Sequence, residues 1–237
     1  MKRIDIKKIS FHNLCLKKSE VETSLNGLSC EFLPSSAIHI QGPVGSGKST
    51  LLKVIVGLEE PHHGDYLINE QSLRGLSYKE FDAYRLNMGI ALGQPALMNN
   101  MSLFENLKLP LDFHSLLSGP EKNDFILKLF TKFGLQDQMH LRPMFATAAA
   151  RKAVGVMRAF VLKPQVILLS NPTHGLQLEH VEALVDLLKM SRSQLDLKYI
   201  FMDSDDEQFN QKLAPTVLDL TIQKMRQQET GGLINGI

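Results

Sequence analysis

Residues 42–50 read GPVGSGKST, and this glycine-rich stretch decides how the rest of the chain is interpreted. It follows the apolar run AIHIQ (residues 37–41), which has the character of a buried strand, and it leads into STLLKVIVGL (residues 49–58), whose apolar spacing predicts a helix that stops at Gly57. A strand, a glycine-rich turn and a helix in this order are what a phosphate-binding loop requires, and the match to G-x-x-x-x-G-K-[S/T] is complete. The alternative is a structural glycine turn with a chance lysine, and the flanking strand and helix argue against it.

Each part of this loop has an expected role toward a nucleoside triphosphate. The glycines let the backbone curl closely around a phosphate chain, and successive N–H groups form an anion site with the N-terminus of the following helix. We expect Lys48 to reach the β and γ phosphates and the Ser49 hydroxyl to ligate Mg²⁺. The residues predicted to bind nucleotide in this loop are Gly42, Pro43, Val44, Gly45, Ser46, Gly47, Lys48, Ser49 and Thr50.

The order of predicted elements indicates an α/β fold. Alternating patterns in IDIKKISF (residues 4–11) and LSCEFL (residues 28–33) predict two early strands. A helical pattern runs from about residue 99 to residue 162, after which the apolar runs QVILLS, KYIFMDS and TVLDLTIQ predict further strands. Strands that alternate with helices favour a mostly parallel sheet, here with a helical insertion between its strands. The tail ETGGLINGI (residues 229–237) is predicted to be a frayed end.

Composition and charge argue against several classes of function. The net charge of +1 lacks the basic excess of nucleic-acid-binding proteins, so we expect no nucleic-acid partner, and we interpret N-terminal lysines such as Lys17 as solvated surface. Cys15 and Cys30 have no disulfide or metal spacing and fit a reducing cytosol, while His62 and His63 are interpreted as an exposed turn. No run approaches the roughly 18 apolar residues that cross a bilayer. We therefore expect a soluble protein that reaches membranes only through a partner.

Beyond the loop, the chain resembles the nucleotide-binding subunit of ATP-binding-cassette (ABC) transport systems over nearly its whole length. Gln94, in GQPALMNNMSLFENLKLPL, resembles the family's Q-loop glutamine, which ligates Mg²⁺ and contacts membrane subunits. The segment RAFVLKPQVILLSNPTHGL (residues 158–176) resembles the stretch from the signature helix to the D-loop. The run NNMSLFENLKLPL (residues 99–111) looks most like bacterial lipid-trafficking (Mla-type) members.

This resemblance implies a fold, cofactors and partners. The implied fold is an α/β P-loop NTPase with a mostly parallel core sheet, an N-terminal antiparallel β region and a helical subdomain of about residues 99–162, all within one domain of residues 1–237. The implied cofactors are ATP and Mg²⁺, with the metal held by Ser49 and Gln94. The implied partners are integral membrane permease subunits and a second nucleotide-binding subunit, identical or different. Such a complex places the chain in the cytoplasm, on the inner face of the membrane.

The sequence departs from the family where bound ATP would be cleaved. Ser170 and Asn171 stand where the Walker B strand of the family ends in Asp-Glu, and residues 146–150 read ATAAA in place of the LSGGQ signature. Gln177 replaces the last aspartate of the D-loop, and Ser204 takes the place of the switch histidine. General-base assistance is commonly worth about 10²–10⁴ in rate. We therefore predict a subunit that binds nucleotide with little or no hydrolysis, and we assign no catalytic role at the altered positions Ser170, Asn171 and Ser204.

Two other interpretations stay open at this stage. In the first, Asp203 or Asp205 serves as a rearranged catalytic base or metal ligand in a working ATPase. In the second, the loop is a vestige in a scaffold that docks on membrane subunits. The base specificity is also open, because residues 12–31 lack the aromatic side chain on which the family stacks adenine. Phe11 is the nearest candidate, and a core position is the simpler interpretation for it.

Overall fold

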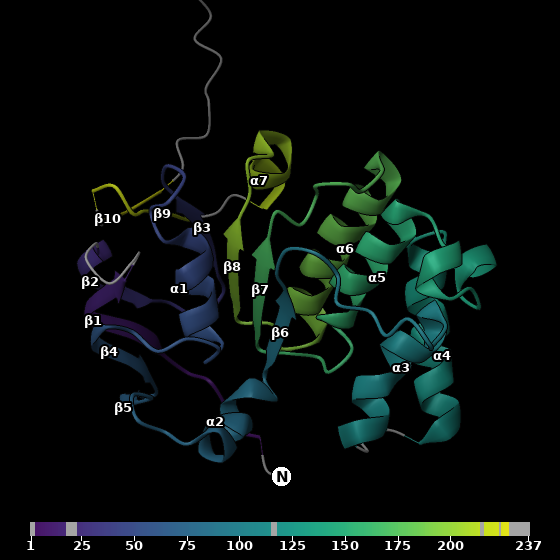
Figure 1. The fold of residues 1–237 in the computed structure, drawn as a ribbon, viewed down its shortest axis with the longest axis horizontal. Helices are drawn as coiled ribbons and strands as arrows, with labels where there is room; N and C mark the ends of the chain where they lie inside the picture. The colour runs from purple at the N-terminus through teal and green to yellow at the C-terminus, as the bar shows by residue number, and fades with distance from the viewer. Residues whose placement is uncertain (1–2, 18–22, 115–117, 214–215, 223, 228–237) are drawn as a thin grey trace, which may run out of the picture.

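Two sheets and a layer of helices make up the fold in the computed structural model, which describes residues 3–17, 23–114, 118–213, 216–222 and 224–227. The larger sheet stands in the middle of the molecule, with the smaller sheet on one side and most of the long helices on the other (Figure 1). The α/β fold expected from the sequence, with a parallel core sheet, an antiparallel N-terminal sheet and a helical layer, is confirmed.

The larger sheet consists of β3 (Ser36–Gln41), β6 (Met88–Ala91), β7 (Val166–Ser170), β8 (Tyr199–Asp203), β9 (Thr216–Asp219) and β10 (Lys224–Gln227). Their order is β10-β9-β3-β8-β7-β6, parallel from β9 to β6 and antiparallel between β10 and β9. Every residue of β7 and β8 is buried, because helices or the second sheet cover both faces of these strands. The carboxyl ends of β3, β7 and β8 therefore meet at one edge, where ligands bind in open α/β sheets.

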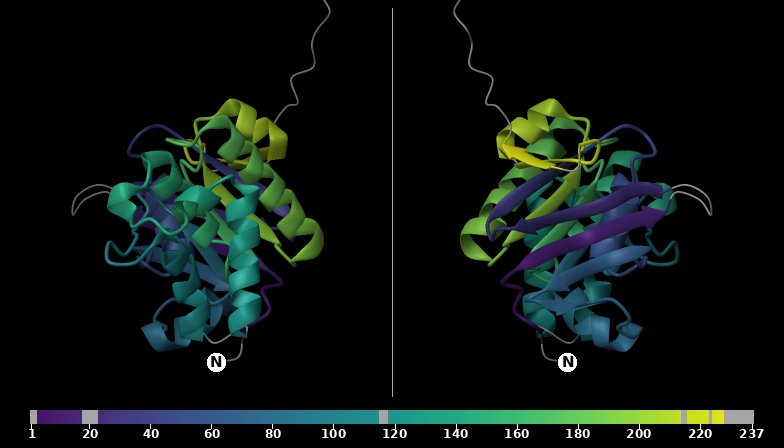
Figure 2. Two further views of the ribbon diagram at one scale, coloured as in Figure 1. Left: turned by 90° about the vertical axis from the view of Figure 1, so that its right-hand side faces the viewer. Right: turned by 90° about the vertical axis from the view of Figure 1, so that its left-hand side faces the viewer.

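The smaller sheet is antiparallel and covers one face of the larger one (Figure 2, right). Its strands are β1 (Ile9–Lys17), β2 (Thr23–Phe32), β4 (His63–Ile68) and β5 (Gln71–Ser72), in the order β2-β1-β4-β5. Helix α1 (Lys48–Ile55) lies between the two sheets, and its apolar face packs into a core that both sheets share. Phe11 is fully buried in this core, edge-on to Phe32 and Tyr66, which confirms its interpretation as a core residue.

The opposite face of the larger sheet carries the helical layer. Its helices are α3 (Leu103–His114), α4 (Gly119–Lys132), α5 (Ala148–Arg158) and α6 (Leu178–Gln194), with two short 3-10 turns at Gln136–Gln138 and Pro143–Phe145. They share a second apolar core that includes Leu107, Phe130, Val154 and Leu184. The segment from α3 to α5 lies within the helical subdomain expected near residues 99–162. Among the described residues, no helix is both long and apolar enough to span a membrane.

The structure corrects several expected boundaries. The first strand begins at Ile9 instead of residue 4, because the Asn69 side chain accepts hydrogen bonds from the N–H groups of Lys7 and Lys8 at 2.7 and 3.2 Å. Those N–H groups are thus satisfied by a side chain and not by a neighbouring strand. Helices α2 (Tyr78–Arg85) and α7 (Glu207–Leu213) are additions that the sequence pattern did not predict. The tail expected to fray lies outside the described residues.

Candidate nucleotide-binding site

The glycine-rich loop links β3 to α1 in a conformation that depends on two of its glycines. Gly45 and Gly47 have φ angles of 84° and 94°, in the left-handed region that side chains with a Cβ rarely adopt. Gly47 is the N-cap residue of α1, so the first N–H groups of the helix face the loop. This arrangement of glycines and helix N-terminus is suited to binding a phosphate group.

Lys48 closes the loop on itself in this structure. Its ammonium Nζ donates a hydrogen bond to the carbonyl oxygen of Gly42 at 2.5 Å, and Ser46 N–H donates to the carbonyl oxygen of Pro43 at 3.1 Å. The hydroxyl of Ser46 is buried and has no hydrogen-bond partner within the described part of the chain. A buried hydroxyl without a partner is rare in folded proteins, and here it lies in a loop shaped to receive an oxygen-rich ligand.

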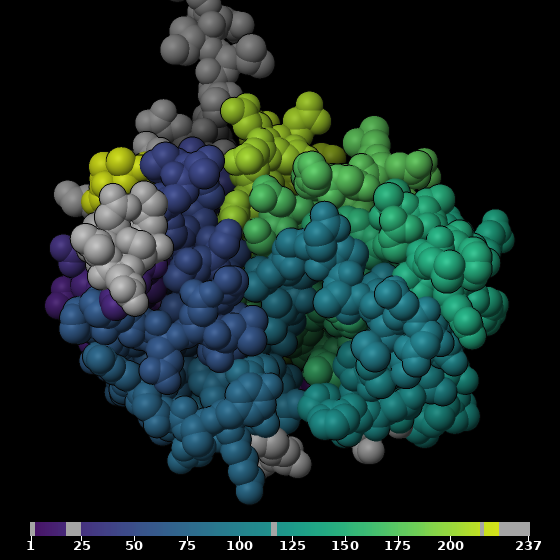
Figure 3. Space-filling model, viewed as in Figure 1, coloured from purple at the N-terminus to yellow at the C-terminus, as the bar shows by residue number. Residues whose placement is uncertain are grey.

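A cavity of 430 Å³ opens on this loop. Residues 43–50 line it together with Asn171, Asp203 and Asp205, which follow or end β7 and β8. Lys17, at the end of β1, is exposed, as expected from the sequence, and it also lines the cavity. In the space-filling view, the blue segment that carries the loop reaches the front surface of the molecule (Figure 3), and Val44 is fully exposed. A ligand therefore has open access to the loop.

Neither Gln94 nor Ser204 lines this cavity. Gln94 is exposed and lines a different hollow of 380 Å³, beside Lys152 and Arg158 of α5. Its expected role as a Mg²⁺ ligand thus stays a prediction, because the structure does not bring it to Ser49. Ser204 is 3% exposed and lines an adjoining polar cavity of 210 Å³. Its carbonyl oxygen accepts a hydrogen bond from Nδ2 of Asn210 at 3.0 Å, which ties it to α7.

The ends of β7 and β8 place a hydroxyl and a carboxyl group side by side. Ser170 and Asp203 are register partners in the parallel pair, and Oγ of Ser170 donates to Oδ2 of Asp203 at 3.3 Å. Both residues are more than nine-tenths buried. Asn171 follows in the left-handed region with φ of 43°, which asparagine tolerates better than most residues, and its N–H donates to the carbonyl oxygen of Asp203 at 2.7 Å.

Burial dominates the electrostatics of this edge. It raises the pKa of Asp203 above its ordinary value, while the charge of Lys48 and the hydrogen bond from Ser170 act in the opposite direction. Burial also disfavours the charged form of His39 on β3 and so lowers its pKa. A hydrogen bond with the Ser204 backbone and the charge of Asp203 act in the opposite direction. A cation at this edge would offset the cost of burying the Asp203 carboxylate.

Residues 146–150, which the sequence is expected to place at the signature motif, form an ordinary helix start. Thr147 is the N-cap of α5, and its Oγ1 accepts a hydrogen bond from the N–H of Ala150 at 3.1 Å. Ala150 is fully buried, whereas Ala148 is exposed. Gln177 stands at the N-cap position of α6 and is exposed, without a side-chain capping bond. In the first turn of α5, the N–H of Ala150 is therefore already bonded to a side chain of the same segment.

Sequence reasoning missed the pairing of Ser170 with Asp203. The signal was present, because both residues end fully apolar runs, VILLS and YIFMD. What the sequence does not contain is the order of the strands, which places β8 directly beside β7. Once that order is known, the last residues of two parallel strands with matched register must face the same way.

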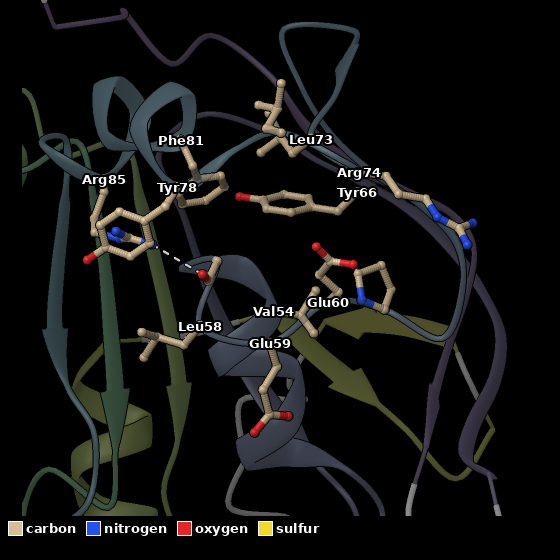
Figure 4. Close-up of a pocket in the computed structure, with 13 residues that line it drawn as sticks. Val54, Leu58, Glu59, Glu60, Tyr66, Leu73, Arg74, Tyr78, Phe81 and Arg85 are labelled. Carbon is tan, nitrogen blue, oxygen red and sulfur yellow. Dashed lines mark hydrogen bonds between the residues drawn. The ribbon is translucent and has the colours of Figure 1, made fainter. Parts of the chain in front are cut away.

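Another pocket lies apart from the loop, at the far end of α1 (Figure 4). It has a volume of 270 Å³ and is lined by aromatic side chains from β4 and α2, among them Tyr66, Tyr78 and Phe81. The Arg85 guanidinium stacks 4.2 Å from the centre of the Tyr78 ring and donates to the carbonyl oxygen of Gly57 at 3.1 Å. None of the residues that line this pocket belongs to the glycine-rich loop.

The family follows from comparison with known proteins. A family model described as "ABC transporter" matches residues 25–174, which include the glycine-rich loop, Gln94 and the end of β7. The chain belongs to the ABC transporter family. Its fold is that of the ATP-binding subunits of ABC transporters, and the resemblance stated from the sequence is confirmed at that level.

Two curated relatives show how far the sequence similarity extends. The methionine import ATP-binding protein MetN of Rhodopseudomonas palustris (strain BisA53) is 28% identical over 190 residues, which cover 78% of this chain and 50% of MetN. The lipoprotein-releasing system ATP-binding protein LolD of Buchnera aphidicola subsp. Schizaphis graminum is 30% identical over 207 residues, which cover 86% of this chain and 88% of LolD. The chain thus spans about half the length of MetN and most of LolD.

A solved structure shows the same fold. The dimeric post-hydrolysis state of the ATP-binding cassette MJ0796, bound to ADP and Pi, has a TM-score of 0.82 and is 24% identical, covering 95% of this chain and all of that cassette. That likeness extends over both sheets and the helical layer of this ABC chain.

Proposed function

We propose that this ABC subunit binds ATP with Mg²⁺ and hydrolyses it slowly or not at all. One observation carries the proposal: residues 43–50, with Lys48 and Ser49, line the cavity. At the end of β7 beside it, however, stand Ser170 and Asn171, where family members have two carboxylates. An asparagine can hydrogen-bond a water molecule but cannot take its proton at neutral pH. Binding is therefore retained by the residues present, whereas activation of water is not.

Each group of the cavity has a role in this proposal. The N–H groups of residues 45–49 and the N-terminus of α1 would hold the phosphates, and Lys48 would exchange its bond to the Gly42 carbonyl for the β and γ phosphates. The hydroxyl of Ser49 suits Mg²⁺, a hard cation that prefers oxygen ligands. Bound nucleotide would then act as a structural or regulatory ligand, since a ligand at 100 times its dissociation constant stabilises the state that binds it by about 2.7 kcal/mol.

The proposed setting is a membrane transport complex. The subunit would pair with a second nucleotide-binding subunit, as the ATP-binding cassette MJ0796 does with its own copy, and dock on permease subunits at the inner face of the membrane. The run at residues 99–111 resembles Mla-type members, which supports a lipid or lipid-linked substrate for the complex. In such a pair, residues 146–150 would face the nucleotide bound by the partner, and they would present alanines where the signature motif has glycines. Pairing would therefore restore hydrolysis neither at this chain's loop nor at the partner's.

A working ATPase with a rearranged base is the second candidate. It is supported by Asp203 and Asp205, because both line the cavity beside the loop. This candidate predicts steady production of ADP that stops when the base is replaced, whereas the binding subunit predicts none above background.

Lys48→Ala tests the binding itself. We expect the variant to bind ATP at least tenfold more weakly than the wild type, because charge-assisted hydrogen bonds to phosphate are about twice as strong as neutral ones. Equilibrium dialysis with labelled ATP measures both dissociation constants, and Lys53→Ala is the matched control, since Lys53 lies on the same helix and pairs with Glu59 at 2.7 Å. Equal and negligible binding in all three proteins would favour a scaffold with a vestigial loop.

A further inference from the structure

The carboxylate that the end of β7 lacks is present one strand away. We infer that Asp203, at the end of β8, makes ATP binding depend on Mg²⁺ by taking the place of the aspartate that Ser170 replaces. This inference rests on the proposed function, because it concerns how the same loop holds its nucleotide. It assigns Asp203 as a positioning residue for the metal and its water shell, and it assigns no base to the site.

The geometry places the Asp203 carboxyl group next to the position it would replace. Ser170 and Asp203 are paired in register on adjacent parallel strands, so their side chains leave the same face of the sheet. The distance of 3.3 Å from Oγ of Ser170 to Oδ2 of Asp203 shows that this carboxyl group leans toward the end of β7. The backbones of the two strands lie roughly 4.8 Å apart, and the side chains of Ser170 and Asp203 meet across that gap.

The surroundings of Asp203 leave its carboxyl group short of partners. The side chain is 4% exposed, and among the described residues Ser170 is its only side-chain hydrogen-bond donor, at a long distance. A buried carboxylate is costly unless it is paired or coordinates a metal. Lys48 is the nearby cation, yet its ammonium group is bonded to the carbonyl of Gly42 and is expected to turn to phosphate. A second cation would therefore stabilise the carboxylate once nucleotide is bound.

The oxygen donors around the loop fit Mg²⁺. The Ser49 hydroxyl and the Asp203 carboxyl group line the same cavity, and hydroxyl and carboxylate oxygens with bound phosphate are the ligands that Mg²⁺ prefers. Asp205 lines the cavity too, but it is exposed, so burial does not demand a cation beside it. This difference singles out Asp203 between the two aspartates.

Asp203→Asn separates a metal-positioning role from a structural one. The variant keeps the shape of the side chain and an oxygen that can accept the Ser170 hydrogen bond, but it removes the charge. In Mg²⁺, we expect it to bind ATP about tenfold more weakly than the wild type, the lower end of the range for groups that orient metal ligands. In EDTA, we expect it to bind ATP as tightly as the wild type or more tightly, because no carboxylate then repels the phosphates.

The experiment measures dissociation constants by equilibrium dialysis with labelled ATP, with and without Mg²⁺, for the wild type, Asp203→Asn and the two further variants that follow. Glu182→Gln is the matched control, because it removes one carboxylate from an exposed residue of α6 that lines neither this cavity nor the adjoining one. The double exchange Ser170→Asp/Asp203→Ser returns the carboxylate to β7 and is expected to restore the dependence on Mg²⁺. Thermal unfolding of each variant verifies that it is folded.

The possible outcomes distinguish this inference from the proposed function. An Asp203→Asn variant that keeps the wild-type affinity both with and without Mg²⁺ would overturn the inference and leave the proposed ATP binding intact. A loss of affinity equal in Mg²⁺ and EDTA would overturn it as well, since that result indicates a structural role. A wild type that binds no ATP in either condition would overturn the proposed function itself.

Discussion

Replacing Asn171 by glutamate is expected to raise the rate of ATP hydrolysis by about 10²-fold over the wild type. The reason is that residue 171 follows β7 directly and lines the cavity on the phosphate loop, where a carboxylate can accept the proton of an attacking water. General-base catalysis covers about 10²–10⁴ in rate. The lower end applies because, under the proposed function, residues 146–150 and Ser204 still depart from the family's pattern.

Asn171→Gln is the control that isolates the proton acceptor. Glutamine has the length of glutamate and pays the same backbone cost at the φ of 43°, on the order of 1–2 kcal/mol, but it cannot take a proton. Steady-state release of phosphate from each variant, with Lys48→Ala as background, measures the effect. Equal rates in the glutamate and glutamine variants would show that the missing carboxylate does not limit turnover.

Replacing Gly89 by alanine is expected to lower the free energy of unfolding by about 3 kcal/mol, about 10²-fold in the folding equilibrium. Gly89 lies in the middle of β6, and a Cβ there would stand 1.9 Å from the carbonyl oxygen of Ala159 and 3.0 Å from Cγ of Pro164. A backbone carbonyl at that distance cannot move aside without shifting the end of α5 or the strand. The clash therefore falls on the contact between the helical layer and the larger sheet.

Gly119→Ala is the matched control for this substitution. Gly119 begins α4, and a Cβ there meets nothing within 4 Å and needs no left-handed backbone. Its unfolding free energy is expected to stay within about 0.5 kcal/mol of the wild type. Urea unfolding curves of the three proteins give the differences from the midpoints. If Gly89→Ala were as stable as the wild type, β6 and α5 would not pack as closely as described.

The parts of the fold that the sequence predicts are those with long or strict patterns. The loop at residues 42–50 has a complete motif, and the runs that become β3, β7 and β8 are apolar throughout because they are buried on both faces. Helices α2 and α7 were missed because each is short and buries only two apolar residues, whereas α1, of similar length, buries four. Their stability comes from tertiary contacts, which a local pattern does not record.

In the candidate site, too, some residues were predicted from sequence motifs and others depend on the arrangement of the strands. Lys48, Ser49, Ser170 and Asn171 are found by motif and spacing, and the structure places all but the buried Ser170 on the walls of one cavity, with Ser170 bonded to a residue that lines it. The approach of Asp203 to Ser170 depends on which strands are neighbours, and that order is a property of the whole sheet. For Gln94, a sequence motif predicts a metal ligand, but the structure places the residue in another hollow.

The central claim is that this ABC subunit holds ATP without consuming it. The most direct measurement incubates the purified protein with Mg²⁺ and ATP labelled in its adenine ring, separates the protein from free nucleotide and identifies what remains bound. Intact ATP on the wild type, lost in Lys48→Ala, is the predicted result. ADP that accumulates over many turnovers would contradict the claim and would make the Asp203 and Asp205 carboxyl groups the first candidates for the catalytic base.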